Sequence, residues 1–576
     1  MSCAGSPRAG SPLPPSPFPP SPLVEARVPA FALASTSPRR ALRAAFHEKL
    51  FEPRESLLTE LDAAVGPQGD MARAALHVAV AAMVWFAVHL LLKENRSSGV
   101  LGVGASALQL ARSLSATAEG VFGRAGVAAA LLSVAALHVL AALCVPLLQL
   151  LTRGGRIVPS RMRFAGCLAL YVALQCALLA AALAACVALR LPPASGFGVM
   201  CEGVRLTMKV HAMLREKVVH GVSALAEAQA HSELGGHDEK RRKRDARRAA
   251  LRCSLAGEED GRGGEDVPRS VRLVLPALAA WLVRFRDYAG GGELSSIKSA
   301  QPRVRIDGWP FELRRFAFFV FAPTMIYRDA YPRSPGSIDF AALLAYAGGF
   351  AATVGFGLLV VRGMVEPALA SLRPRQPATL ANYFNTVFEL MAPSALLFLA
   401  TFFAVLHCWL NFWAVALRFA DRRFYGAWWT SRTWGAWYRS WNSVVGEWIW
   451  TYVYNDLQRL GAGRGLALSM TFLLSAVLHE LILAGALGFL FPALFVAFAG
   501  PGVGLLWFTR CLPPRTANTF LWLALSLGVS LLFVVYLDES GLRDNGGRKL
   551  SCIERLLDAV APRSLAAWAA AAAASA

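Results

Sequence analysis

Charged residues are scarce in this sequence. Asp, Glu, Lys and Arg make up 17% of the 576 residues, whereas 55% are hydrophobic and the mean hydropathy is +0.44. Several apolar runs are longer than the roughly 18 residues that mark a candidate transmembrane helix. A soluble fold has no way to bury that much apolar sequence, so the composition predicts an all-α polytopic membrane protein.

Acidic residues are especially few, because 38 Asp and Glu stand against 58 Lys and Arg, which gives a net charge of +20. Such an excess can indicate nucleic-acid binding. Here the basic residues lie mainly beside apolar runs, and this pattern orients membrane proteins by keeping Lys and Arg on the cytoplasmic side. We therefore predict no nucleic-acid partner.

Paired cysteines and a signal peptide are also missing. The ten cysteines form no C-x-x-C pair, and Cys144, Cys167, Cys176 and Cys186 lie in apolar segments where Cys acts as a small hydrophobe. We expect no metal site. Nothing before residue 71 resembles the apolar region of a signal peptide, so we expect the first span to direct targeting, as in a multi-pass protein of the endoplasmic reticulum membrane.

Changes in composition divide the chain. Residues 1–53 begin with a stretch dense in Pro, Ser, Ala and Gly, which predicts a disordered cytoplasmic tail before a membrane domain over 54–576. The membrane domain should open with a short amphipathic helix at 54–65. Within it we expect a mobile cytoplasmic loop at 231–310, and a cytoplasmic aromatic loop and helix at 418–463.

Apolar runs predict eight of about nine transmembrane helices. These runs cover about 72–92, 126–151, 164–190, 339–362, 389–417, 465–489, 490–511 and 518–536. The segment 311–335 is too short and too interrupted by proline to span, so we expect it to pack at the membrane surface.

The ninth crossing is polar. Residues 240–252 are strongly basic and should be cytoplasmic, which requires one more crossing at 197–218. That segment carries the charged residues Glu202, Arg205, Lys209 and Arg215. It can therefore cross only by turning its charges toward a wet or polar interior, and this predicts a cavity in the bundle. An amphipathic helix lying on the membrane surface is the alternative.

Aromatic residues gather between the fifth apolar run, 389–417, and the sixth, 465–489. Seven of the 15 tryptophans fall between positions 428 and 450. From 434 to 448 they recur at intervals of three and four with Tyr438 and Val445, which predicts one amphipathic helix with an aromatic face. An interfacial Trp and Tyr belt is the simpler interpretation. Asn442 lies beside this face.

His479 and Glu480 interrupt the apolar run 468–491. Ionisable side chains in a membrane span are costly, so they commonly mark a functional site that faces a cavity or the bundle interior. The alternative is a core His with one satisfied hydrogen bond.

Six short motifs together resemble a known family. They are CEGVRLTMK (201–209), YRDAYPR (327–333), LHCWLN (406–411), FYGAWWT (424–430), YRSWN (438–442) and SAVLHE (475–480). In this order, over roughly residues 50–560, they resemble the sterol O-acyltransferases of the membrane-bound O-acyltransferase family. YRDAYPR and LHCWLN look like the sterol branch, whereas the diacylglycerol branch shares the WN and HE blocks.

The resemblance implies transfer of a long-chain fatty acyl group from acyl-CoA to the 3-hydroxyl of cholesterol or another sterol, in a reaction chamber enclosed by nine spans. His479 would be the catalytic base and Asn442 its partner. A neutral imidazole can take the hydroxyl proton as the oxygen attacks the thioester, and we expect burial in an apolar chamber to keep the ring neutral. Asn442 could donate a hydrogen bond to the developing oxyanion.

Further site residues follow from the same resemblance. Those expected to contact acyl-CoA are Tyr438, Trp441, Tyr454, Arg464 and Ser475. His407 would support the sterol site, and the motif residues of the aromatic loop are Phe424, Tyr425, Trp428 and Trp429. Arg464 and Ser475 also fit simpler roles, as an interfacial Arg and a small residue for helix packing. Acyl-CoA is a substrate, so no cofactor is expected; the partners are membrane lipid and further copies in a homo-dimer or homo-tetramer.

The chain departs from the family pattern in three places. The pattern FYxDWWN becomes FYGAWWT, with Ala427 and Thr430 in place of an acid and an amide, and Gly446 replaces a His. Cys552 has no partner beyond Cys511 for the luminal disulfide of the animal enzymes. These departures keep open a catalytically weakened relative that binds sterol or acyl-CoA, and a diacylglycerol acyltransferase is a further alternative. Composition alone also allows a transporter or channel with polar groups at mid-depth, although no inverted repeat is visible.

Overall fold

The computed structural model describes residues 51–63, 81, 84–85, 88, 103–123, 125–153, 156–157, 161–218, 307–372, 380–544 and 562–564. The chain divides into Met1–Glu48 and Lys49–Ala576, and every described residue belongs to the second unit. Most of the predicted tail at 1–53, of the first span at 72–92 and of the loop at 231–310 lies outside the described residues.

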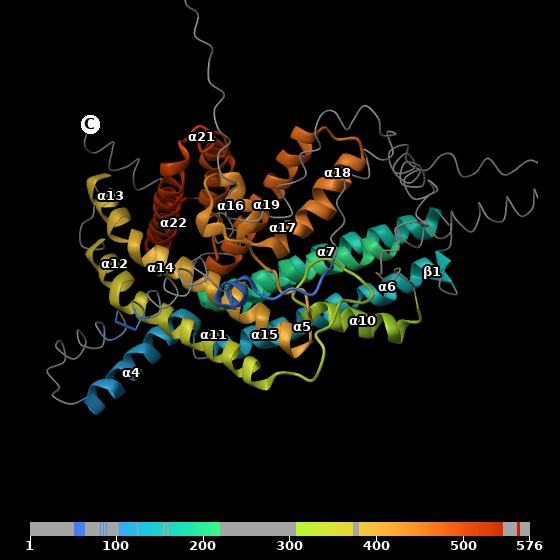
Figure 1. The fold of residues 1–576 in the computed structure, drawn as a ribbon, viewed down its shortest axis with the longest axis horizontal. Helices are drawn as coiled ribbons and strands as arrows, with labels where there is room; N and C mark the ends of the chain where they lie inside the picture. Colours follow the sequence, from blue (N-terminus) through green and yellow to red (C-terminus); the bar gives the residue numbers. More distant parts are fainter. Residues whose placement is uncertain are drawn as a thin grey trace, which may run out of the picture. The chain divides into compact units, whose positions relative to one another are not determined.

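Helices make up nearly all the regular structure of the described chain (Figure 1). The first part contains α2 (Leu57–Ala63), α4 (Val103–Phe122), α5 (Gly126–Ala142), α6 (Cys144–Leu151), α7 (Arg161–Ala188), a helix over 193–218 and α10 (Trp309–Phe321). One small antiparallel hairpin, β1 (Thr152–Arg153) with β2 (Arg156–Ile157), is the exception to the all-α prediction in these residues.

The second part is interrupted by short π-helical segments. It contains α11 (Phe340–Val360), η3 (Val361–Val365), α12 (Glu366–Leu372), α13 (Leu380–Glu389), α14 (Met391–Phe402), η4 (Phe403–Trp409), α15 (Leu410–Ala416), η5 (Trp428–Thr430), α16 (Trp434–Trp441), α17 (Ser443–Ile449), η6 (Trp450–Tyr454), α18 (Asn455–Arg459), α19 (Arg464–Leu487), α20 (Ala493–Ala497), η7 (Phe498–Gly502), α21 (Val503–Phe508) and α22 (Pro514–Asp544). η5 is a 3₁₀ turn and the other four are π-helical. Such π segments often occur at functional sites.

Six helical stretches in the described residues are long and apolar enough to cross a membrane. They are Leu114–Leu150, Ala165–Ala188, Phe340–Leu369, Met391–Ala416, Arg464–Leu487 and Thr516–Arg543. They agree with six of the predicted spans and support a polytopic membrane protein. The predicted span at 490–511 corresponds to the helical stretch Ala493–Phe508, which is shorter than the roughly 20 residues a crossing needs. Nine spans are therefore not confirmed.

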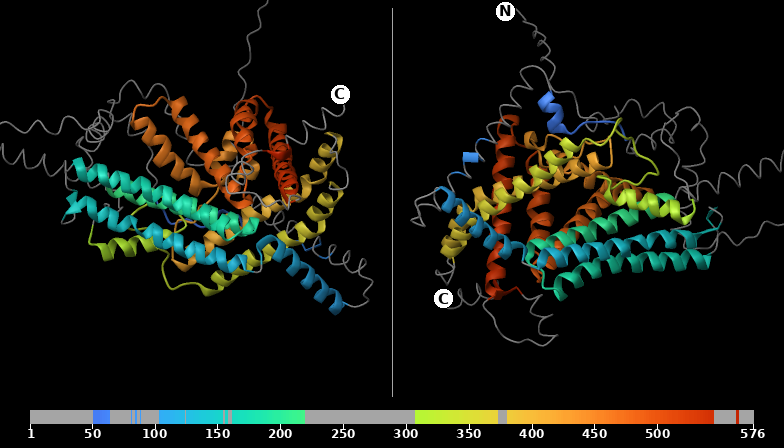
Figure 2. Two further views of the ribbon diagram at one scale, coloured as in Figure 1. Left: turned by 180° about the vertical axis from the view of Figure 1, so that it is seen from behind. Right: turned by 90° about the horizontal axis from the view of Figure 1, so that it is seen from below.

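Several helices lie side by side in the views of Figures 1 and 2. α5 and α6 run along α7, and α10 packs against α6. α14 packs against both α11 and α22, and α19 contacts α7, α20 and η7. α4 was not predicted. α2 lies within the predicted helix at 54–65, and Arg54 just before it forms an ion pair with Asp421 at 2.8 Å.

The charges of the 193–218 helix are paired with protein groups. Lys209 Nζ donates to the carbonyl oxygens of Phe319, Val320 and Ala322 at 2.5, 3.0 and 2.8 Å, where α10 ends and leaves carbonyls without helical partners. Lys217 Nζ lies 2.9 Å from Glu312 and 2.7 Å from Asp329. Of the two predicted surroundings, a wet or a polar interior, Lys209 has the polar one, because it is buried against protein carbonyls.

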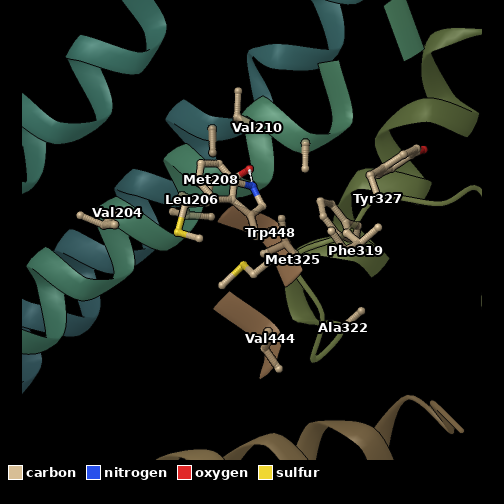
Figure 3. Packing of buried hydrophobic residues seen from close by; sticks show 14 of the residues in the cluster. Val204, Leu206, Met208, Val210, Phe319, Ala322, Met325, Tyr327, Val444 and Trp448 are labelled. Atoms are coloured by element: carbon tan, nitrogen blue, oxygen red, sulfur yellow. Dashed lines mark hydrogen bonds between the residues drawn. The ribbon is translucent and has the colours of Figure 1, made fainter. Parts of the chain in front are cut away.

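The same helix also forms much of the apolar core (Figure 3). Val204, Leu206, Met208 and Val210 pack with side chains of the 309–327 segment and of α17. The Trp448 indole N–H donates to the Met208 carbonyl at 3.0 Å. The segment 311–335, expected only at the membrane surface, thus contributes Phe319, Ile326 and Tyr327 to the buried core.

Candidate active site

His479 lies on a continuous helix, α19, that begins at Arg464. The two residues are 15 positions apart, which corresponds to roughly 22 Å at 1.5 Å per residue. The ring atom Nδ1 lies 2.7 Å from the carbonyl oxygen of Ser475. A carbonyl can only accept, so in the neutral ring Nδ1 carries the proton and Nε2 carries the lone pair. No hydrogen bond to Nε2 occurs within the described residues.

The surroundings of His479 are aromatic. The Phe498 ring lies 5.3 Å from the imidazole and 6.3 Å from the Tyr438 ring, and Tyr438 meets Phe472 edge-on at 5.3 Å. These contacts bring α16, α19 and η7 together around the histidine. Burial raises the pKa of Tyr438 to about 12, so its hydroxyl remains a hydrogen-bond donor at neutral pH.

His479 is exposed in this structure, so the burial that we expected for its ring is not found in the described surroundings. The hydrogen bond to Ser475 fixes the tautomer instead. The Ser475 hydroxyl lies 3.5 Å from Nδ1, one helical turn away on the same face. The structure therefore brings Ser475 and His479 together as the sequence predicted.

Asn442 separates two helices. Its backbone leaves the helical region, with φ −140° and ψ 90°, and its side-chain oxygen accepts the Val445 N–H at 3.1 Å as the N-cap of α17. The predicted single helix over 434–448 is therefore wrong, because Asn is a favoured N-cap and here begins a new helix. Within the described residues no hydrogen bond joins Asn442 to His479, and the Asn442 amino group makes none.

The aromatic loop folds into a cluster of rings. Phe424, Tyr425 and Trp428 are buried, whereas Trp429 is half-buried. Trp441 stacks on Phe398 with the ring centroids 4.4 Å apart, and it meets Trp428 edge-on at 4.9 Å. The residues predicted as a motif thus form one packed unit, and Trp441 packs inside it.

Two residues of α22 hold this loop, and neither was predicted. The Asn518 amide donates to the carbonyl oxygens of Trp429 and Ser431 at 3.0 and 2.8 Å. The Trp522 indole N–H also donates to the Trp429 carbonyl, at 3.1 Å. Their spacing of four residues places both on one face of the last predicted span, which is the only signal that the sequence offers.

The departures from the family pattern lie where side chains have room. Ala427 and Thr430 are exposed, and the Thr430 hydroxyl donates to the Ala427 carbonyl at 2.8 Å. A Cβ atom added to Gly446 would meet nothing within 4 Å. The packing of the aromatic loop therefore does not depend on the acid, the amide or the histidine that this chain lacks.

His407 connects two of the motifs. It is buried in η4, and its Nδ1 lies 2.7 Å from the hydroxyl of Tyr425 in the aromatic loop. One turn later, Asn411 donates to the His407 carbonyl and accepts from Arg422 at 2.9 Å. The sequence placed His407 in a supporting role, and these bonds tie η4, α15 and the aromatic loop together.

Tyr454 and Arg464 flank the turn that leads into α19. Tyr454 ends η6, where it stacks on Trp450 with centroids 4.2 Å apart and its hydroxyl accepts from Gln458 at 3.0 Å. Arg464 is exposed at the first position of α19. Because η6 packs against α19, both residues lie at the same end of the helix that carries the histidine.

Arg439, inside the YRSWN motif, is a candidate that the sequence reasoning missed. Partial burial lowers the pKa of its guanidinium, and the positive charge of Arg510 lowers it further. No ion pair of either arginine occurs in the described residues. The Arg510 guanidinium lies 5.4 Å from the centroid of the Trp507 ring.

Metal binding has no support in the described ranges, where no three His, Cys, Asp or Glu side chains are grouped as ligands would be. The absence of a cofactor stays a prediction.

Comparison with known proteins identifies a family domain in this chain. Residues 285–537 match the model of the membrane-bound O-acyltransferase family. This range contains His407, the aromatic loop, Asn442 and His479. The chain therefore carries a membrane-bound O-acyltransferase domain, and the resemblance found in its motifs is confirmed.

Several similar curated proteins are sterol O-acyltransferases. Sterol O-acyltransferase 2 of Rattus norvegicus is 38% identical over 232 residues, which cover 39% of this chain and 43% of the relative. The Homo sapiens protein of the same name is 37% identical over 232 residues, with the same coverage. Sterol O-acyltransferase 1 of Cricetulus griseus is 34% identical over 259 residues, or 44% of this chain and 46% of the relative. The matched part thus spans less than half the length of these relatives.

Proposed function

We propose that this protein transfers a long-chain fatty acyl group from acyl-CoA to the 3-hydroxyl of a sterol, with cholesterol as the first candidate. The observation that carries the proposal is the His479 imidazole, whose Nδ1 is held by the Ser475 carbonyl and whose Nε2 has no protein partner in the described residues. The family match and the names of the similar proteins support the reaction class and the acceptor.

The proposed reaction begins with the sterol hydroxyl beside Nε2. The imidazole takes the hydroxyl proton while the oxygen attacks the thioester carbon, and the carbonyl oxygen gains negative charge. The carbon–sulfur bond then breaks, and the imidazolium returns its proton to the departing CoA sulfur. The Ser475 carbonyl stabilises the charged ring through the Nδ1 proton and keeps Nε2 pointed at the reacting oxygen.

Asn442 fits the role of an oxyanion donor because its two polar atoms are used differently. The oxygen is fixed by the Val445 N–H, which leaves the amino group as the only donor available to a substrate. A rigid donor aimed at the developing oxyanion is worth about 10²–10³ in rate. The same cap also limits the rotation of the side chain, so one bond serves both folding and orientation.

Acyl-CoA would enter at the end of α19 that begins with Arg464, beside Tyr454 of η6. The negatively charged head of CoA stays outside the membrane, where Arg464, Arg439 and Arg510 offer positive charge, and the thioester reaches along α19 past Ser475 to His479. Residence in the endoplasmic reticulum membrane and a homo-dimeric or homo-tetrameric state belong to the same proposal.

The test is an acyl transfer assay in microsomes with labelled oleoyl-CoA, in which cholesterol or diacylglycerol is offered as acceptor. We expect label in cholesteryl ester from the wild-type chain and background label from His479→Gln. Preferential labelling of diacylglycerol would overturn the sterol acceptor. No ester from either acceptor, with the protein present at normal level, would indicate a relative that binds without turnover.

A further inference from the structure

Glu480 is a buried carboxyl group beside the proposed base, and the reaction above does not use it. It lies on α19 directly after His479, and the residues that follow it to the end of the helix are apolar. Within the described residues no hydrogen bond joins it to His479. A buried carboxyl group needs hydrogen bonds to offset the cost of leaving water, so its partners show what it does.

Those partners lie at the start of the helical stretch 493–508. Glu480 Oε2 accepts the Phe495 N–H at 3.1 Å, and the Tyr536 hydroxyl donates to Glu480 at 3.1 Å. The Tyr536 oxygen in turn accepts the Leu494 N–H at 3.0 Å. The residue before this helix is Pro492, which provides no side-chain cap. The first N–H groups of the helix, which lack partners within it, are thus bonded to side chains from α19 and α22.

The turn between α19 and α20 is fixed at the same place. Gly488 ends α19 with φ +77°, a left-handed conformation that glycine adopts without strain. The chain then reverses, and Phe491 packs edge-on against Tyr536 with centroids 6.0 Å apart. Phe489, Phe491 and Tyr536 form a separate small core cluster. The returning helix is therefore anchored to α22 through both polar and apolar contacts.

This anchor has a consequence for the proposed active site. Phe498 follows Leu494 by four residues, one helical turn, and its ring lies 5.3 Å from His479 and 6.3 Å from Tyr438. We infer that Glu480 and Tyr536 are positioning residues: they hold the start of the 493–508 helix so that Phe498 lies against the His479 imidazole. The role in catalysis rests on the proposed function, whereas the anchoring does not.

The test uses full-length protein in detergent with three variants. Tyr536→Phe keeps the ring packing and removes the hydroxyl, Glu480→Ala removes both acceptors, and Glu480→Gln keeps one acceptor. Glu539→Gln is the matched control. Glu539, on α22, is a buried carboxyl group like Glu480, but its hydrogen bonds go to Ser564 and Arg543 and not to the 493–508 helix. Thermal melting of each variant confirms that it is folded.

Two measurements read the anchor without any need for activity. Hydrogen–deuterium exchange of the peptide over 493–498 should become roughly five- to tenfold faster in Glu480→Ala and Tyr536→Phe, because the acceptors of its first amides are removed. The rate at which diethyl pyrocarbonate modifies His479, read by mass spectrometry, should rise in the same variants as Phe498 moves away. Glu480→Gln should give intermediate values, and Glu539→Gln should match the wild type.

The catalytic part is read as a split between kcat and KM. In both anchor variants kcat for cholesteryl oleate should fall by roughly 10- to 100-fold, with little change in KM for oleoyl-CoA, because the ring that bounds the base is misplaced. Unchanged exchange at 493–498, unchanged modification of His479 or unchanged kcat in the folded anchor variants would overturn the inference. If the wild type itself makes no ester while exchange and modification respond as expected, the proposed function fails and the anchor stands.

Discussion

Two helices of this protein carry ionisable side chains among apolar ones, and they use them differently. In the 193–218 helix, Lys209, Arg215 and Lys217 end on protein carbonyls or carboxylates. On α19, Glu480 is bonded to Tyr536 and to the backbone, whereas His479 keeps Nε2 without a protein partner in the described residues. Burial of a polar side chain is therefore weak evidence for a catalytic role. A histidine whose tautomer is fixed at one nitrogen and whose other nitrogen has an available lone pair is stronger evidence.

The largest effect should come from His479. His479→Gln and His479→Ala should each lower ester formation by about 10²–10⁴, since the proton acceptor is lost. Protein level, oligomer size and binding of oleoyl-CoA should stay normal, because the hydrogen bonds of the ring within the described residues go to Ser475 on its own helix. Activity in microsomes and quantitative immunoblotting measure the two quantities. If His479 were only structural, the His479→Gln protein would stay active and the His479→Ala protein would be present at a low level.

Variants of the charged residues in the 193–218 helix should behave in the opposite way: they should lower the stability of the protein without a specific effect on the rate of ester formation. Lys217→Met removes the cation that lies between Glu312 and Asp329, and breaking such a buried pair costs about 3–5 kcal/mol. Lys209→Met is the control, because Lys209 bonds to neutral carbonyls and its loss should cost less. Thermal melting in detergent measures both. Equal melting temperatures for Lys217→Met and the wild type would refute the structural role.

Asn442 tests whether one residue can both take part in the reaction and stabilise the fold. Asn442→Asp keeps an oxygen for the Val445 N–H and loses the amide donor, so it should fold normally and lose about 10²–10³ in rate. Asn442→Ala should lose the rate and, in addition, about 1 kcal/mol of stability with the cap. Rates and melting temperatures of both variants separate the two roles. Normal turnover by a folded Asn442→Asp protein would leave Asn442 as a cap alone.

The smallest effect concerns the residues that depart from the family pattern. Ala427→Asp with Thr430→Asn restores the pattern at two exposed positions, so stability should change by no more than about 0.5 kcal/mol. Ester formation and KM for oleoyl-CoA should change less than in any variant above. A large gain in rate would mean that this chain is a weakened relative.

The sequence predicted the features that depend on local pattern. Long apolar runs located six spans. Motif spacing located Ser475 one helical turn from His479, and it located His407 in the same part of the chain as its bonding partners Asn411 and Tyr425. The break at Asn442 was missed because the aromatic spacing of three and four continues across it, while the cap depends on the backbone of one residue.

Long-range contacts were not predictable from one sequence. The bonds from Asn518 to the aromatic loop and from Tyr536 to Glu480 join residues far apart in the chain, and no periodicity encodes them. The partners of Lys209 are backbone carbonyls, which every residue has, so charge counting suggested a wet or polar interior without showing that α10 supplies the acceptors. The exposure of His479 likewise depends on how α19 and η7 pack.

The most direct test of the proposed base is a single-turnover experiment with purified protein. Labelled oleoyl-CoA is bound first, cholesterol is added, and bound thioester and ester are quantified over time. The wild type should convert the bound thioester to cholesteryl oleate, whereas His479→Gln should hold the thioester unreacted with the same occupancy. Formation of the ester at a near-normal rate by a folded, fully loaded His479→Gln protein would contradict the account.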